Sequence, residues 1–153
     1  MAGPSEPRQS ACGRHRRGIR LRPVTPAQRA ELVRRYFETV HHNPAETFDL
    51  YASEAVLHYS GRHRLSGDHR GPAGVMELFE RSRQAFRGSQ RLVVHDVLAG
   101  EEHAVALLSA SALLAGREVT WNRVVVFHAA GGLITEQWIV DGDQQLVDDL
   151  IGT

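Results

Sequence analysis

Hydrophobic residues recur at helical spacing near the start of the chain. Thr25 and Pro26 are a favoured N-cap and a favoured first-turn residue, and Gln28 stands at the capping-box position. The apolar positions that follow share one helical face: Leu32, Val33, Tyr36, Phe37 and Val40. This spacing predicts a helix that begins at Thr25.

Two more helices are predicted before residue 90. Asn43-Pro44 repeats the same start signal, and a short helix is expected from there to about Tyr51. Gly71-Pro72 opens a longer helix that ends at Gly88, because glycine is favoured just past a helix end. The face that this helix would bury carries Val75, Leu78, Phe79, Ser82 and Phe86.

The rest of the chain has the pattern of β-strands. A strand is expected over residues 55–59, and the polar segment 60–71 is expected to be a loop with a short strand near Arg64-Leu65. Four long apolar segments follow, and short glycine-containing turns between them require antiparallel pairing of neighbours. These segments are Arg91–Ala99, His103–Ala115, Arg117–His128 and Leu133–Val140. A last helix is expected over Gln144–Ile151.

Three helices followed by a long meander predict an α+β fold with the helices on one face of the sheet. The predicted strands, about 8 to 13 residues long, exceed the usual length, and a sheet of such strands must coil. We therefore predict a cone-shaped domain over residues 25–153. In this domain a strongly curved mixed, mostly antiparallel sheet wraps around three N-terminal helices and leaves a pocket for a small molecule.

Composition excludes several function classes. The chain has 153 residues, and its 18 lysine and arginine residues balance 18 acidic ones, so no global charge favours nucleic acid or a membrane. The chain contains no lysine, which excludes Schiff-base chemistry on a lysine side chain. The single cysteine, Cys12, can form no intramolecular disulfide, and a cytoplasmic localisation is the simplest interpretation. No apolar run approaches the ~20 residues that span a bilayer.

Residues 1–24 are predicted to be a disordered, arginine-rich tail. The first 22 residues hold six arginines and one acid among Gly, Pro and Ser, with little apolar surface to bury. An arm that binds nucleic acid is the alternative. No aromatic residues are interleaved with the arginines, so a nucleic-acid partner is not expected.

Four short strings occur in a characteristic order: Arg-Tyr-Phe at 35–37, and the segments 50–56, 65–71 and 132–138. Together they resemble the nuclear-transport-factor-2-like superfamily, most closely its SnoaL-like polyketide-cyclase and ketosteroid-isomerase-like branches. The resemblance covers about Thr25 to Ile151. It implies a small-molecule substrate and a homodimer formed through the outer face of the sheet. The superfamily includes isomerases, polyketide cyclases, epoxide hydrolases and binding-only domains.

The resemblance also implies roles for single residues. Tyr36 matches the phenolic hydrogen-bond donor of the isomerases. Their general base falls on Tyr59 and their second acid near Val124, so steroid isomerisation in its known form is not expected. The cyclases and epoxide hydrolases keep an essential aspartate in the last strand; that position is Ile139, and Asp141 lies two residues further on the same face.

We therefore predict three catalytic side chains. Tyr36 and Tyr59 would donate hydrogen bonds to the reacting oxygen, and Asp141 would move the proton. Glu136, five positions before Asp141, would point to the opposite face.

Further pocket residues are predicted from strand and helix positions. The predicted substrate-binding side chains are Phe79, His95, Asn122, Val124 and Gln137. Because Trp121 and Arg123 alternate with Asn122, they are expected on the other face of the sheet.

The nine histidines match no metal-binding spacing, so no metal site is expected. The sequence predicts a cofactor-independent cyclase, isomerase or epoxide-opening enzyme. Its substrate would be a hydrophobic oxygenated molecule, polyketide- or terpenoid-like, of the kind met in secondary metabolism. The alternative is a non-catalytic module of the same fold that binds a small molecule or dimerises.

Overall fold

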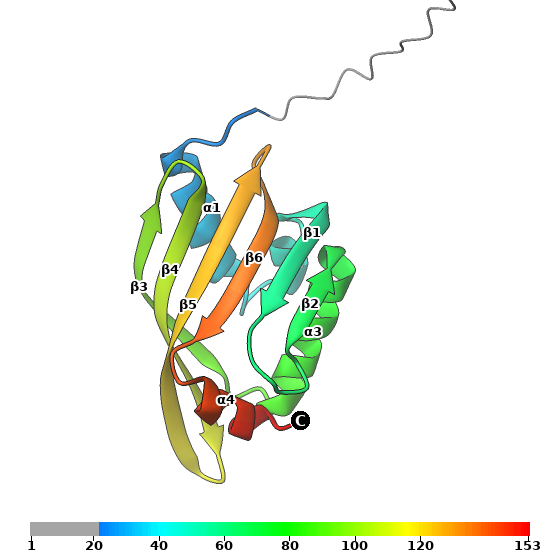
Figure 1. Ribbon diagram of the computed structural model, residues 1–153, viewed down its shortest axis with the longest axis vertical. Helices are drawn as coiled ribbons and strands as arrows, with labels where there is room; N and C mark the ends of the chain where they lie inside the picture. Colours follow the sequence, from blue (N-terminus) through cyan, green and yellow to red (C-terminus); the bar gives the residue numbers. More distant parts are fainter. Residues whose placement is uncertain (1–21) are drawn as a thin grey trace, which may run out of the picture.

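A computed structural model describes residues 22–153, in which a curved sheet wraps around helices (Figure 1). The tail that is predicted to be disordered spans residues 1–24, and residues 1–21 of it lie outside the described residues. Residues 22–25 have no regular structure and lead into the first helix. None of the helices in the described part of the chain is long and apolar enough to cross a bilayer.

The helices begin where the sequence signals predict. α1 spans Pro26–Thr39, and its capping box is complete, because the Thr25 hydroxyl accepts from the Gln28 amide and the Gln28 side chain accepts from the Thr25 amide. The other helices are α2 (Pro44–Phe48), α3 (Gly71–Ala85) and α4 (Gln144–Ile151). α2 is shorter than predicted.

The six strands form one sheet in the order β2-β1-β6-β5-β4-β3. They are β1 (Tyr51–Tyr59), β2 (Gly67–Arg70), β3 (Arg91–Ala99), β4 (His103–Leu114), β5 (Arg117–Ala130) and β6 (Leu133–Asp141). Every pair is antiparallel except β1 with β6, so the sheet is mixed, as predicted. Two local predictions were wrong: Tyr51 opens β1 rather than ending a helix, and the short strand lies at Gly67–Arg70 rather than at Arg64-Leu65.

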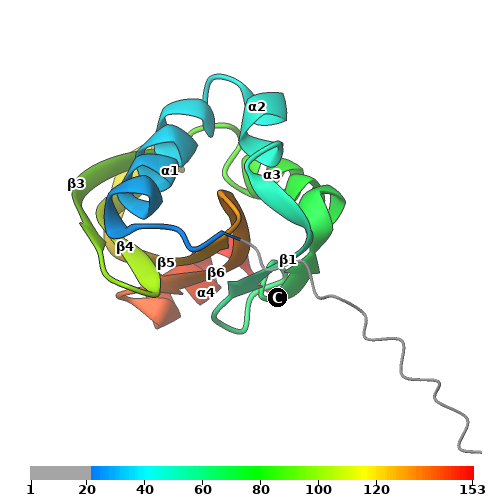
Figure 2. The same ribbon diagram turned by 90° about the horizontal axis from the view of Figure 1, so that it is seen from above.

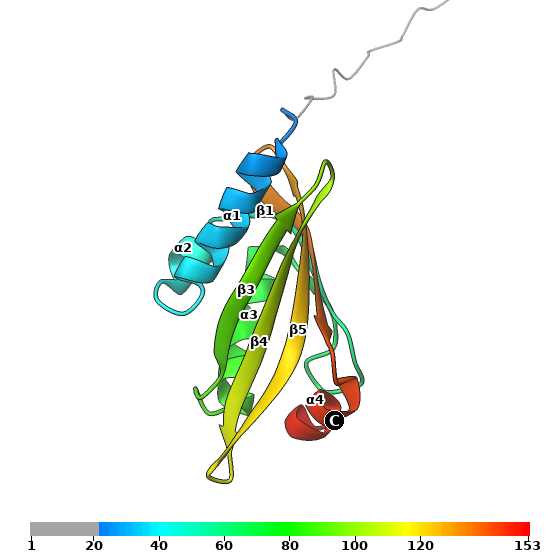
Figure 3. The same ribbon diagram turned by 90° about the vertical axis from the view of Figure 1, so that its left-hand side faces the viewer.

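The sheet curls around the helices, and this curvature creates the interior of the cone. Figure 2 shows α1, α2 and α3 along the open side of the curled sheet, and Figure 3 shows α1 lying along β3 and β4. α4 follows β6 in the chain and lies below it (Figure 1). The inner face of β4 is mostly alanine, with Ala104, Ala106, Ala110 and Ala112 all buried, and these short side chains let α1 pack close to the strand.

Two β-bulges decide which side chains face the interior. The pairing of β3 with β4 shifts between Val94 and Asp96, and the pairing of β5 with β6 shifts between His128 and Ala129. Because side chains alternate between the faces of a strand, a shift of one residue exchanges the inward and outward positions beyond it.

Candidate functional site

A cavity of about 520 Å³ lies between the concave face of the sheet and the three helices packed on it. This volume is typical of sites that bind a small organic molecule. Helices α1 to α3 and strands β1, β3, β5 and β6 all contribute to its wall. The apolar lining includes Phe37, Val40, Phe48, Leu78, Phe79, Leu92, Val125 and Ile139.

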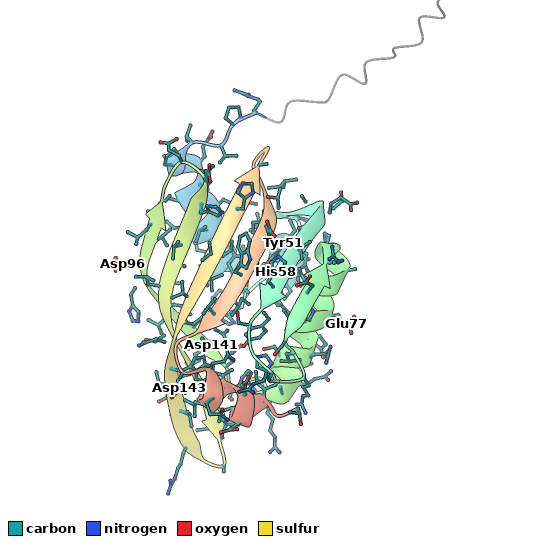
Figure 4. All side chains as sticks on the ribbon, viewed as in Figure 1. Tyr51, His58, Glu77, Asp96, Asp141 and Asp143 are labelled. Carbon is teal, nitrogen blue, oxygen red and sulfur yellow. The ribbon has the colours of Figure 1, made fainter. Side chains whose placement is uncertain are left out.

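A buried ion pair lies at the β5–β6 wall of this cavity. Arg123 on β5 is directly opposite Asp141 on β6, and its Nε donates to Asp141 Oδ1 at 2.7 Å. Arg123 Nη2 donates to the other carboxylate oxygen at 3.1 Å, and Trp121 Nε1 donates to Oδ1 at 2.8 Å. The side chains are 5% and 0% exposed. Figure 4 places Asp141 near the end of β6, where the chain turns into α4.

The same guanidinium holds the hydroxyl of Tyr59. Arg123 Nη2 donates to Tyr59 Oη at 2.6 Å, and the guanidinium carbon lies 5.3 Å from the centre of the phenol ring. Burial raises the pKa of Tyr59 far above its ordinary value, and the Asp141 carboxylate acts in the same direction against the opposing effect of Arg123. The phenol is therefore neutral and keeps a proton to donate.

Arg123 has donor capacity left over. Burial alone would lower its pKa, but the adjacent Tyr59 and Asp141 outweigh burial and raise it, so the guanidinium stays charged. Nε and Nη2 make all of its hydrogen bonds within residues 22–153, which leaves the two N–H groups of Nη1 without a partner there. Arg123 lines the cavity, so the side chain with this unused donor capacity belongs to the cavity wall.

A second polar chain supports Tyr36. Gln137 on β6 is fully buried, and its Nε2 donates to Tyr36 Oη at 3.2 Å, while Tyr51 Oη donates to Gln137 Oε1. Burial raises the pKa of Tyr36 against the opposing hydrogen bond from Gln137, so this phenol is also neutral. Since its oxygen accepts from Gln137, its own proton remains available to the cavity that Tyr36 lines.

Charged groups at other points of the lining are paired with each other. Glu80 and Arg83, both on α3, form an ion pair at 2.8 Å, and hydrogen bonds from Arg83 and Gln84 lower the pKa of Glu80 to about 2. His41 also lines the cavity, and burial lowers its pKa, with a further lowering from the adjacent His42. The lining therefore keeps its polar groups in a few places, separated by apolar surface.

Three predicted site residues line the cavity: Tyr36, Tyr59 and Phe79. Gln137 faces inward and donates to Tyr36, but it does not itself line the cavity. Asp141 is buried, as its strand position predicted, yet it does not line the cavity, and its oxygens accept from Arg123 and Trp121. Its geometry is that of a counter-ion that fixes Arg123.

Asn122 and Val124, both on β5, were predicted to bind substrate in the cavity. This prediction was wrong, because both lie on the outer face of the sheet. The tight turn at 131–132 alone would set Asn122 opposite Asp141. The bulge after His128 shifts the pairing by one residue, so Arg123 takes that place. Asn122 is exposed, and Val124 shares its outward direction.

His95 was also predicted wrongly, and a bulge is again the reason. The break in pairing between Val94 and Asp96 leaves His95 as the extra residue of β3. Its side chain is exposed, and its Nε2 lies 2.7 Å from the Ser109 hydroxyl rather than in the cavity.

The sequence prediction therefore missed Arg123, the residue that donates to both Asp141 and Tyr59. Arg123 and Trp121 were expected outside, but both are buried and face inward. The run Val124-Val125-Val126 carries no alternation of polar and apolar residues, so it gives no indication of which face is buried. The one usable signal was a charged residue two positions after Trp121 and directly before three valines, on a strand that must pair with the strand of Asp141.

Glu136 points outward, as predicted. It accepts from His58 Nε2 at 2.8 Å, and Asp68 lies 2.6 Å from Nδ1 of the same ring. Each carboxylate contacts a different ring nitrogen (Figure 4 labels His58), so the three groups do not converge on one point. Among residues 22–153 no three His, Cys, Asp or Glu side chains are grouped to hold a metal ion.

Comparison with known proteins gives a family and a fold. The model of the SnoaL-like domain matches residues 33–137. Comparison with curated proteins returned no match.

Solved structures share the fold over most of their length. Bal32a from a soil-derived mobile gene cassette is 22% identical with a TM-score of 0.77, covering 83% of this chain and 98% of its own. TerC co-crystallised with polyporic acid is 15% identical with a TM-score of 0.73 (82% and 99% covered). An NTF2-like protein from Burkholderia pseudomallei is 19% identical with a TM-score of 0.71 (82% and 98% covered). These similarities establish the fold alone, so an argument about the chemistry must rest on the residues of the cavity.

Proposed function

The chain belongs to the SnoaL-like domain family of the NTF2-like superfamily, and from this membership and the cavity we propose that it is a polyketide-cyclase-like enzyme. Its substrate is a hydrophobic, oxygen-bearing small molecule, and the reaction is ring closure, isomerisation or epoxide opening. The reacting oxygen accepts hydrogen bonds from Arg123 and Tyr59.

One observation carries this proposal. Arg123 is a charged donor, 5% exposed, in the wall of a mostly apolar cavity, with Nη1 unpartnered among the described residues. A donor fixed in a dry site is worth far more to a developing negative charge than the same donor in water, because no solvent must reorganise. Asp141 accepts from Nε and Nη2 along one edge of the guanidinium and Tyr59 accepts from Nη2, so the orientation of Nη1 is preorganised.

The two phenols suit the same chemistry. A neutral phenol donates to a carbonyl or epoxide oxygen without becoming a base, and the raised pKa values of Tyr59 and Tyr36 keep both protonated. The apolar wall would hold a flexible substrate in a folded, reactive conformation, which lowers the barrier by several kcal/mol. TerC, a protein of the same fold, was co-crystallised with polyporic acid, which supports a small organic molecule as the kind of ligand.

A panel of neutral hydrophobic ketones, phenols and epoxides tests the proposal. Binding is measured by quenching of Trp121, whose ring lies 5.8 Å from the Arg123 guanidinium, in a Trp138→Phe background. Conversion is measured by mass spectrometry and chiral chromatography. Tyr59→Phe should lower the turnover or affinity of any compound that the protein accepts by about tenfold or more, the effect of a hydrogen bond in a charged network. Unchanged binding and turnover would refute the role of Tyr59.

The second candidate is binding without conversion. It is favoured by the pairing of Asp141, which leaves no unpaired carboxylate beside Arg123 and Tyr59 in the described cavity wall. Tight binding of the same panel with no change in any compound would support this candidate and exclude the enzyme.

A further inference from the structure

A second polar point of the cavity lies on α3 and the start of β3. Ser82 and Gln90 both line the cavity, and the Ser82 hydroxyl donates to Gln90 Oε1 at 3.4 Å. The other end of that amide, Gln90 Nε2, is buried and has no hydrogen-bond partner. Leaving a buried donor unpaired is unfavourable, so such an atom in a native structure needs an explanation.

Gln90 differs from the other unpartnered groups by its position. The buried side-chain atoms without a partner in the described chain belong to Arg29, His63, Ser66 and Gln90, and of these residues only Gln90 lines the cavity. Gln90 also lines a second hollow of about 850 Å³ beside the cavity, together with His41 and Leu92. It therefore lies where the cavity continues toward the surface.

The sheet register separates Gln90 from the Arg123–Tyr59 pair. Leu92 is opposite Ala110, which is opposite Trp121, so Arg123 lies two strands away from β3. β3 and β5 run in the same direction, and Leu92 is level with Trp121. Gln90 lies two residues before that level and Arg123 two residues after it. The two backbone positions are thus about 13 Å apart along the strands and about 10 Å apart across them. Both residues line the cavity, and its lining also includes the apolar side chains Leu92, Val125 and Leu78.

We propose that Gln90 is a substrate-recognition residue and that the natural ligand carries two oxygen functions at opposite ends of an apolar body. One oxygen accepts from Arg123 and Tyr59, and the other accepts from Gln90 Nε2, with Ser82 fixing the amide. This inference rests on the proposed function, because it assumes that the Arg123 end binds an oxygen.

Two matched pairs of probes test it by calorimetric titration. The pairs are 6-methyl-2-naphthol with 2,6-dihydroxynaphthalene, and 4-hydroxy-4′-methylbiphenyl with 4,4′-dihydroxybiphenyl. Within each pair a methyl group replaces the distal hydroxyl, and the two bodies differ in length. In the wild type, the dihydroxy member of at least one pair should bind roughly fivefold more tightly, the effect of one neutral hydrogen bond. Gln90→Leu should abolish that preference and leave the affinity for the methyl compound unchanged.

The control variant is Gln145→Leu, the same substitution at an exposed position of α4, and it should retain the preference. Urea unfolding of Gln90→Leu should show a midpoint no lower than that of the wild type, since the variant removes an unpartnered amide. The inference is overturned if neither dihydroxy compound is preferred, or if the preference survives Gln90→Leu. If a methyl compound binds in a Tyr59-dependent way but the distal hydroxyl adds nothing, only the Gln90 inference fails. If no probe binds, the proposed function and the Gln90 inference both fail.

Discussion

Removing Arg123 and Asp141 one at a time, and then together, gives a sharp test of how the site is built. The proposed variants are Arg123→Met, Asp141→Leu and the double variant. Arg123 is 5% exposed and Asp141 is completely buried, so each single change leaves its former partner charged and almost without water. A buried charge without its partner is among the most destabilising features that a substitution can produce.

The structure sets the expected size of each effect. Asp141→Leu would leave Arg123 bonded only to the neutral Tyr59, and Arg123→Met would leave Asp141 with only neutral donors, the Trp121 indole and the Tyr59 hydroxyl. Each single variant should lose about 3–5 kcal/mol of unfolding free energy. The double variant replaces the pair by apolar side chains and leaves the Trp121 N–H without an acceptor, so it should lose only about 1–3 kcal/mol. The two changes should therefore be non-additive by roughly 3 kcal/mol or more.

Urea unfolding followed by circular dichroism measures all four proteins. The slope of the free energy with urea should be the same for each, which shows that the unfolded state has not changed. Arg83 and Glu80 provide the matched control, because they form an ion pair of similar length on an exposed helix surface, with 65% and 49% exposed side chains. The corresponding cycle there should show no resolvable coupling.

Additive losses at Arg123 and Asp141 would refute the reasoning. They would mean that the two side chains do not form a dry pair and that the guanidinium is not fixed by Asp141. The proposed preorganisation of Arg123 Nη1 would then have no physical basis.

Three further measurements follow from other parts of the molecule. Gln137→Leu leaves Tyr36 and Tyr51 without their shared partner, so the unfolding free energy should fall by about 2–4 kcal/mol in urea titrations, and a loss below about 1 kcal/mol would contradict the buried chain. Partial burial alone would lower the pKa of His58, but hydrogen bonds and charge from two carboxylates raise that pKa above 6.5. The protonated ring therefore stabilises the fold below pH 6.5, and this stabilisation is lost as the pH rises through the folded-state pKa. In calorimetric melting, the wild type should therefore have a higher midpoint than His58→Gln near pH 5.5, and the two midpoints should coincide near pH 9. A difference in midpoint that stays constant with pH would contradict the ion pairs. We also expect a homodimer through the outer face of the sheet, so light scattering should give the mass of two chains and Trp138→Glu should give that of one; a single-chain mass for the wild type would contradict this.

The sequence predicted elements more accurately than it predicted faces. The capping signal at Thr25 located α1, and the glycine-containing turns located β3 at Arg91–Ala99, because these are local effects of backbone chemistry. The mixed sheet also followed from the resemblance and the order of the elements. Nothing local, however, indicated that β1 would start at Tyr51.

The errors at the site have one cause. Asn122 was assigned to the cavity by counting alternate residues along a strand, Val124 from the resemblance and His95 from its mid-strand position, and a bulge in β5–β6 or β3–β4 alters the face on which these residues lie. A bulge depends on pairing between strands, so its effect on Arg123 could not be obtained from β5 alone. The pairing of Arg123 with Asp141 and the unpartnered Gln90 amide likewise depend on contacts between distant segments.

A crystal structure of the protein with the tightest-binding phenol or ketone of the panel would test the central claim most directly. The account predicts electron density for the compound inside the cone, with one oxygen within hydrogen-bond distance of Arg123 Nη1 or Tyr59 Oη and the ring against Val125 and Ile139. A compound bound only outside the cone, or a cavity filled by side chains with the Arg123 edge covered, would contradict it.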